Sequence, residues 1–145
     1  MKRLLAMAAL LLGLGLPWWA DATAINGITP ADAVAIHEAV QPQLDALAND
    51  DASGAFKLAT REKRLLIGSP DNFLRLIKEQ YNPIYRYQRA LFSTPQLLDG
   101  NAVQVVRVTD SESHVWLAIF WMQQEQGKNW KIDGCQLLQT TSVSV

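Results

Sequence analysis

The sequence contains few of the residues that build disulfides or metal sites, because its 145 residues include one cysteine and two histidines. With a single thiol, Cys135, the chain cannot form an internal disulfide. His37 and His114 lack the close spacing at which zinc ligands usually occur, and we expect both at exposed positions. We therefore predict no disulfide and no metal site.

An excess of positive charge is also missing, since 13 Lys and Arg residues stand against 14 Asp and Glu residues, a formal net charge of −1. Binding to a phosphate backbone needs a concentrated basic face. The one basic cluster is Arg61, Lys63 and Arg64, and Glu62 interrupts it. We interpret this cluster as a solvated helix face, so nucleic acid is not an expected partner.

The sequence shows no phosphate-binding loop, no nucleophile elbow and no dinucleotide-binding fingerprint. Those motifs need glycines at fixed spacings, and glycines such as Gly54 and Gly68 are isolated. We therefore expect no cofactor, and the sequence favours a non-catalytic protein.

The one long apolar run lies at the N-terminus, at residues 4–16, directly after Lys2 and Arg3. As a helix it would reach only about 20 Å at ~1.5 Å per residue, short of the roughly 30 Å core of a bilayer. A basic start, a short apolar run and a small-residue end are typical of a secretory signal peptide. An uncleaved anchor is the alternative.

We place the signal peptide at residues 1–22, with cleavage favoured after Ala22 or Ala24, and with Ala20 as a further small residue. The remaining residues 23–145 are enough for one domain. The sequence thus predicts an exported protein, periplasmic or secreted, without a stable membrane span.

The first half of that domain has helix signals. Thr29 is a cap, Pro30 suits the first helical position, and Pro42 should kink or split the helix. The apolar stripe of this helix is Ile36, Val40, Leu44 and Leu47.

Further helices are expected after the first. A short one is expected over 52–59 and a turn of helix before Gly68. A longer one starts at Ser69 and ends at Asn82-Pro83, with a buried face formed by Phe73, Leu76, Ile77 and Tyr81. We interpret Asp50 and Asp51 as helix-boundary caps rather than an acid/base pair.

The second half reads as strands, at residues 84–92, 102–110, 114–123 and 129–138. Short breaks join them, so we expect an antiparallel meander. Helices followed by strands indicate an α+β fold, with the helices packed on one face of a four-stranded sheet.

The third strand is apolar on both faces, so both should be covered. The N-terminal helices can cover only one face. A partner chain, the C-terminal tail or sheet curvature would cover the other. We prefer a homodimer formed through the outer sheet face.

Three segments carry a resemblance to a known family: DDASGAFKLA, SPDNFLRLIKEQYNPIYR and GKNWKIDGCQL. Together they resemble domain of unknown function 4864, a group of small, exported, mostly bacterial proteins, over about residues 32–139. The last segment is also similar to the wider nuclear-transport-factor-like, or cystatin-like, cone. The resemblance implies a curved antiparallel sheet wrapped on a long helix, and it brings no activity with it.

Cone folds of this kind also include enzymes with an Asp base and a Tyr donor in an apolar pocket. In this sequence Asp133, Tyr85 and Tyr87 are the low-priority candidates for such a pair, because all three fall in strand-like runs. A small hydrolase or isomerase is therefore the alternative function. The main hypothesis is a non-catalytic domain that binds a small apolar ligand or a protein partner. Its candidate binding aromatics are Trp116, Phe120, Trp121 and Trp130.

Cys135 has no histidine near it in the sequence, whereas a nucleophilic cysteine needs a base and a partly exposed setting. We interpret it as a packing thiol in or near the core. Gly134 indicates a β-bulge, which would change the face on which Cys135 lies. Interchain pairing and a redox or nucleophilic role are the alternatives.

Overall fold

The computed structural model describes residues 27–127 and 129–140. The predicted signal peptide therefore lies outside the described residues.

The first described helix, α3 (Pro30–Ala48), begins where the sequence predicts. The Thr29 side chain accepts a hydrogen bond from the backbone N–H of Asp32 at 3.1 Å, which caps the helix. The predicted apolar stripe is fully buried. The helix runs through Pro42 without a break, so of the two predicted effects, a kink or a split, the split is wrong. Pro42 is exposed, and water can satisfy the carbonyl group that loses its partner.

Four shorter helices follow: α4 (Ala52–Phe56), α5 (Arg61–Ile67), α6 (Pro70–Gln80) and α7 (Asn82–Tyr85). Helix α4 is shorter than predicted, because the chain beyond it pairs with the last strand. There the backbone N–H of Thr60 donates to the carbonyl of Ile132 at 2.9 Å. Of the predicted buried face of α6, Phe73 and Ile77 are buried, whereas Leu76 and Tyr81 are only half-buried. Asn82-Pro83 ends α6 and also begins α7, which the sequence analysis does not predict.

The strands are β1 (Arg89–Phe92), β2 (Gln96–Leu98), β3 (Asn101–Thr109), β4 (Val115–Glu125) and β5 (Asn129–Gln139). They form one antiparallel sheet in the order β1-β3-β4-β5, and β2 also pairs with β3. The α+β fold is confirmed, but the number of strands is five instead of four. The edge strand is divided at residues 93–95, where Pro95 cannot donate to the ladder.

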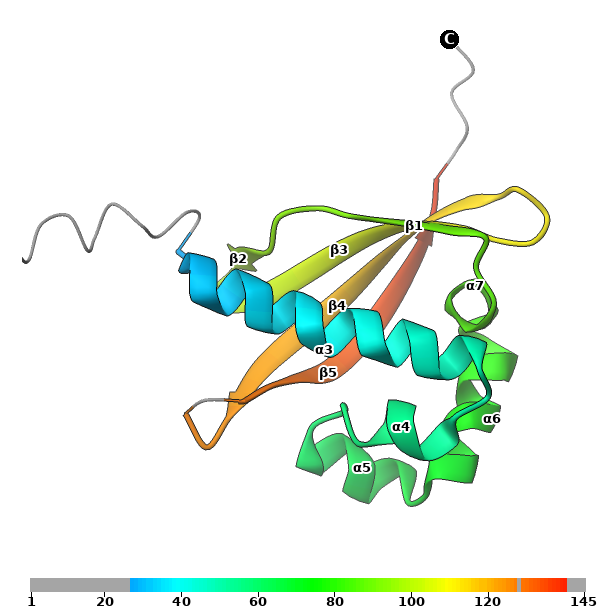
Figure 1. Ribbon diagram of the computed structural model, residues 1–145, viewed down its shortest axis with the longest axis horizontal. Helices are drawn as coiled ribbons and strands as arrows, with labels where there is room; N and C mark the ends of the chain where they lie inside the picture. The colour runs from blue at the N-terminus through cyan, green and yellow to red at the C-terminus, as the bar shows by residue number, and fades with distance from the viewer. Residues whose placement is uncertain (1–26, 128, 141–145) are drawn as a thin grey trace, which may run out of the picture.

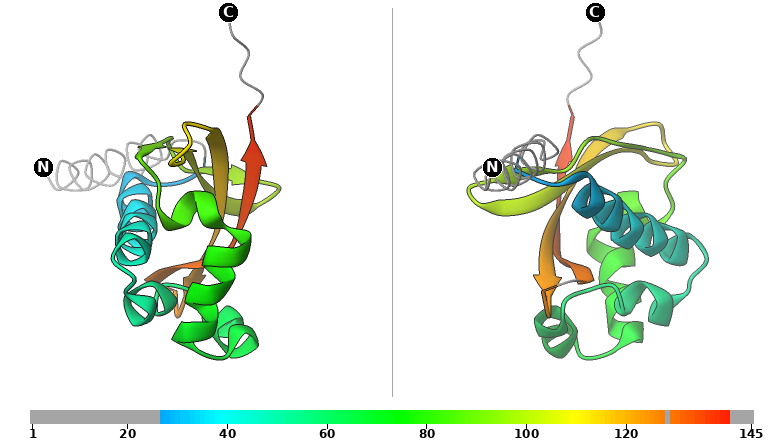
Figure 2. Two further views of the ribbon diagram at one scale, coloured as in Figure 1. Left: turned by 90° about the vertical axis from the view of Figure 1, so that its right-hand side faces the viewer. Right: turned by 60° about the vertical axis from the view of Figure 1, so that its left-hand side comes forward.

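The helices α3, α4, α6 and α7 lie on one side of the sheet (Figures 1 and 2). Helix α3 crosses β3, β4 and β5 on that side (Figure 1). Side chains fill the space between them: Leu44, Val106 and Phe120 have no exposed surface. This arrangement agrees with the curved, cone-like α+β fold implied by the resemblance.

A β-bulge interrupts the pairing of β4 with β5, where Trp121 faces Gly134 but Met122 faces Ile132. Asp133 is the additional residue. The bulge predicted from Gly134 is therefore confirmed, and it changes the register as expected. Because of it, Cys135 faces Phe120 and lies on the core side of β5.

Candidate functional site

The outer face of the sheet is the side that points away from the helices. On β4, Ala118, Phe120 and Met122 belong to the core, so the alternate residues point outward. We define the outer face by three cross-strand rows: Leu91–Arg107–Leu117–Leu138, Val105–Ile119–Gln136 and Gln96–Val103–Trp121–Gly134.

These rows are mostly apolar, and most of their side chains are accessible to solvent, although Val103 is only 1% exposed. Leu91 is 55% exposed and Leu138 is 44% exposed, while Leu117, Ile119 and Trp121 are half-buried. Arg107 is the one charged residue in the three rows. An apolar face of this kind is typical of a surface that contacts another molecule.

The size of the outer face can be compared with that of a stable protein interface. The three rows cover five residues of β4, from Leu117 to Trp121, roughly 16 Å at ~3.3 Å per residue. Four neighbouring strands span about 19 Å, which gives an apolar area of roughly 300 Å². Stable complexes bury about 800 Å² on each partner, so the three rows can form the apolar centre of an interface whose rim lies on the more polar rows at either end.

The four candidate binding aromatics do not lie together on this face. Trp121 is on it, at the end near the bulge. Phe120 is buried in the core, and the indole N–H of Trp130 donates to Asp32 of α3 at 3.2 Å. The indole N–H of Trp116 donates to Asp110 at 2.9 Å. Three of the four therefore stabilise the fold from the helix side.

Asp110 is held in a turn between β3 and β4. It accepts hydrogen bonds from Trp116 and from the backbone N–H groups of Glu112 and His114. These bonds, that of Trp116 first, lower the pKa of Asp110 below its ordinary value. The carboxylate therefore has a structural role in this turn.

Asp133 lines a hollow of about 410 Å³ beside the bulge, together with Lys63, Asn101, Trp121, Met122, Gln123 and Gly134. Its carboxylate accepts a hydrogen bond from the hydroxyl of Thr60 at 2.9 Å. Neither Tyr85 nor Tyr87 lines this hollow. The structure therefore does not bring Asp133 together with a tyrosine there.

The prediction that the two tyrosines lie on a strand is wrong. Tyr85 is the last residue of α7 and Tyr87 lies in the connection to β1, which begins only at Arg89. Tyr87 packs against the core. The helix continues past Pro83 because proline is well suited to the first turn of a helix.

Tyr85 belongs instead to a polar cluster that the sequence analysis does not identify. Its hydroxyl donates to Asp50, and the guanidinium of Arg86 donates to the same carboxylate at 2.8 Å. The ammonium of Lys78 lies 3.8 Å from Asp50 and 5.3 Å from the centre of the Tyr85 ring. The hydrogen bond from Tyr85, with smaller contributions from the two cations, lowers the pKa of Asp50.

The prediction that Asp50 caps a helix is therefore wrong. Its backbone has φ of 54°, a left-handed conformation that aspartate adopts more readily than most residues. Asp51 is a cap, because its side chain accepts from the backbone N–H of Gly54 at 3.0 Å. Sequence could not identify the Asp50 cluster, since its partners lie 35 and 36 residues away.

Cys135 lies among core residues, although the residue as a whole keeps partial exposure. Burial of the thiol raises its pKa to about 12. At neutral pH the group is a thiol rather than the nucleophilic thiolate. This agrees with a packing role.

Both histidines are at exposed positions. His37 lies beside Phe92, with 4.4 Å between ring centres, and His114 lies 3.5 Å from Asp110. Among residues 27–127 and 129–140, no cluster of three or more His, Cys, Asp or Glu side chains could hold a metal ion.

A small apolar hollow of about 260 Å³ lies where α3 begins. It is lined by Ile28, Pro30, Ala33, Thr94 and Pro95. It could accept a small apolar group at the surface, but it is separate from the packed space between α3 and the sheet.

These features define a class: a small α+β protein with helices on one side of an antiparallel sheet and an open apolar face on the other. The family model "Domain of unknown function (DUF4864)" matches residues 29–145. The chain belongs to this family, which confirms the resemblance seen in its sequence. No curated protein and no solved structure matches the chain. None of the helices in the described part is long and apolar enough to cross a membrane.

Proposed function

We propose that this chain is an exported, non-catalytic binding domain whose outer face binds a protein, and that the first such partner is a second copy of the chain. The observation that carries this proposal is the set of three apolar rows on the side of the sheet without helices. Export is supported by the signal-like pattern at residues 1–22.

A second copy is favoured as the partner because the face has the properties of an isologous interface. Its three rows contain a single charged residue, Arg107, and the more polar rows at either end, with Arg89 and Lys131, can form the rim of a two-fold interface. A two-fold axis would place the leucines and Ile119 of one copy on the same residues of the other. Arg107 lies in an outer row next to the edge strand, where its charged end can reach the polar rim.

The experiment is sedimentation velocity of the chain from residue 23 onward, from low to hundreds of micromolar. We expect a reversible dimer. In the double variant Leu91→Lys/Leu138→Lys, two charges at exposed outer-face positions should shift the protein to monomer.

The matched control is Val34→Lys, because Val34 is 58% exposed on α3, away from the outer face. It should dimerise like the unmodified chain. Thermal melting of each variant shows that it is folded. A monomer throughout the concentration range, or an equal effect of both changes, would contradict the proposal.

The apolar hollow at the start of α3 supports binding of a small apolar ligand as a second candidate function. Native mass spectrometry of protein from its own host would show a retained ligand as added mass. Replacing Ala33 by a larger residue, in Ala33→Leu, should fill the hollow and remove that mass. Retention of the ligand by Ala33→Leu would exclude this hollow.

A further inference from the structure

Helix α5 differs from the other helices because it has no buried residue. Leu65 and Leu66 are each 73% exposed, more than the other large hydrophobic residues exposed in the described part of the chain. The helix is held at its ends: Thr60 caps its start, and the Gly68 N–H donates to the carbonyl of Arg64 at 2.9 Å. The leucines thus make little contribution to the fold.

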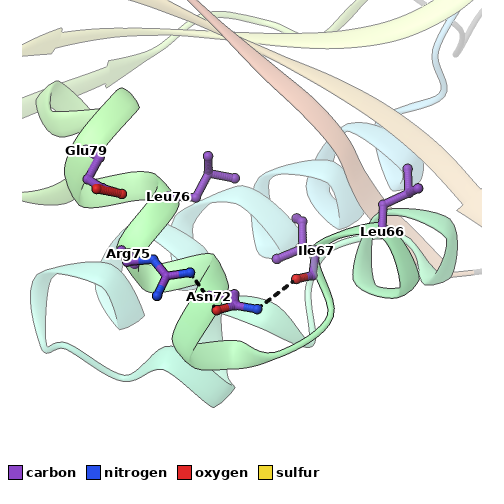
Figure 3. A pocket seen from close by; sticks show the side chains of 6 residues that line it. All are labelled: Leu66, Ile67, Asn72, Arg75, Leu76 and Glu79. Carbon is purple, nitrogen blue, oxygen red and sulfur yellow. Dashed lines mark hydrogen bonds between the residues drawn. The ribbon is translucent and has the colours of Figure 1, made fainter.

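The surface continues onto α6 across a hollow of about 360 Å³. Leu66, Ile67 and Leu76 line this hollow, along with Asn72, Arg75 and Glu79 (Figure 3). The amide of Asn72 donates to the carbonyl of Ile67 at 3.2 Å, and Arg75 donates to Asn72 at 2.8 Å. These bonds fix α5 against α6, so the leucines stand on a preformed surface.

Basic residues lie on the same two helices as the leucines, and we call the exposed surface of these helices the α5–α6 surface. Helices α5 and α6 carry five cationic side chains and three carboxylates; Lys78 pairs with Asp50, and the other four cations leave a net charge of +1 (4 − 3), in a chain whose net charge is −1. The cluster Arg61, Lys63 and Arg64 comes directly before the two leucines. A partner should therefore be apolar at its centre and negatively charged around it.

We propose that the α5–α6 surface docks onto an anionic lipid bilayer, with Leu65 and Leu66 entering the interface and the basic side chains meeting the headgroup phosphates. Apolar residues next to a basic face are typical of segments that lie in a membrane interface. Anionic headgroups attract basic residues at the membrane surface, and lysine or arginine near it strengthens binding.

The spacing of the apolar residues favours a bilayer over a protein groove. A helix that fits a groove presents residues at i, i+3, i+4 and i+7. Leu65 and Leu66 are adjacent and lie about 100° apart around the helix, so they form a broad apolar edge, while Ile67 packs against the core. A fluid lipid surface can accept such a convex shape.

The test is flotation of the chain from residue 23 onward, which contains every described helix and strand, with phosphatidylcholine vesicles made with or without phosphatidylglycerol. We expect binding to the vesicles that contain phosphatidylglycerol. Leu65→Ser/Leu66→Ser should lower the partition coefficient about tenfold or more. Arg61→Gln should lower it about fivefold, and added salt should weaken binding.

The matched control is Val34→Ser, an exposed apolar residue on α3 outside both this surface and the outer face, which should bind like the unmodified chain. The leucine variants should melt at the same temperature as the unmodified chain, because both leucines are largely exposed. Absence of vesicle binding would overturn the proposal and would favour an acidic protein partner. Binding that the leucine variant retains, or that does not depend on phosphatidylglycerol, would also overturn it.

Discussion

Helices α5 and α6 are neighbours that begin in a similar way but differ in how much apolar surface they bury. Each begins after a hydroxyl cap, Thr60 or Ser69, and each contains several large apolar residues. In α6, Phe73 and Ile77 are four residues apart, so they point the same way and are buried. In α5 the apolar residues are consecutive: Leu65 and Leu66 are exposed, and Ile67 at the end of the helix is half-buried against the core. Spacing, rather than apolar content, decides which helix joins the core.

The two helices are therefore stabilised in different ways. Helix α6 gains from burial, since the Phe73 ring lies 5.8 Å from that of Phe56. Helix α5 depends on polar contacts at its start: Glu125 accepts from the backbone N–H of Arg61 at 2.7 Å, and Thr60 bonds to both Lys63 and Asp133. Substitutions should distinguish stabilisation by burial in α6 from stabilisation by polar contacts in α5.

The largest effect is expected from Phe73→Ala, which should lower the free energy of unfolding by about 3–5 kcal/mol because it leaves a cavity in the core. Leu65→Ala is the matched change in α5 and should alter it by less than about 0.5 kcal/mol. Urea unfolding of both variants measures the difference. Losses of equal size would contradict the conclusion that burial stabilises α6 but not α5.

The next effect concerns the caps. Thr60→Ala removes the cap of α5 and leaves Asp133 without its hydroxyl donor, so we expect a loss of about 2 kcal/mol. Ser69→Ala removes only the cap of α6 and should cost about 1 kcal/mol.

Thr60→Ser keeps the hydroxyl and should remain close to the unmodified chain. Amide hydrogen exchange in α5 should increase in Thr60→Ala and stay unchanged in Ser69→Ala. An equal increase in both would show that the two helices open together.

The smallest effect is expected at the Asp50 cluster, which links the end of α3 to α6 through Lys78 and to α7 through Tyr85. The pKa of Asp50 is lowered from 3.8 in the folded state. Its contribution to stability is therefore present above about pH 3.8 and is lost as the pH falls through the lowered pKa.

Tyr85→Phe removes the main cause of this shift, so the pKa of Asp50 should rise and the acid dependence of unfolding should decrease. NMR titration of the Asp50 carboxyl measures the pKa directly. Tyr87→Phe is the control, since Tyr87 packs against the core and makes no bond to Asp50 in the structure. An unchanged pKa in Tyr85→Phe would exclude the hydrogen bond as its cause.

Local signals in the sequence predicted much of the fold. The caps at Thr29 and Ser69, the stripe of α3 and the bulge at Gly134 all depend on neighbouring residues, and all are found in the structure. The α+β order follows from the change in residue pattern after Pro83. These features need no knowledge of distant contacts.

Contacts between distant residues were not predictable in the same way. The bond between Trp130 and Asp32 joins residues 98 positions apart, and it moves an expected binding aromatic to the helix side. The divided edge strand was missed because Leu97 and Leu98 lie between turn-forming residues. The sequence correctly identified the doubly apolar β4, but only the register shows which residues remain open on its outer face.

Hydroxyl-radical footprinting at increasing protein concentration would test most directly the claim that the sheet has one sealed side and one side open for a partner. We expect Leu91, Trp121 and Leu138 to become protected as the concentration rises, while Phe120 is protected throughout and Leu65 and Leu66 stay reactive. Outer-face reactivity that does not change with concentration would contradict this account.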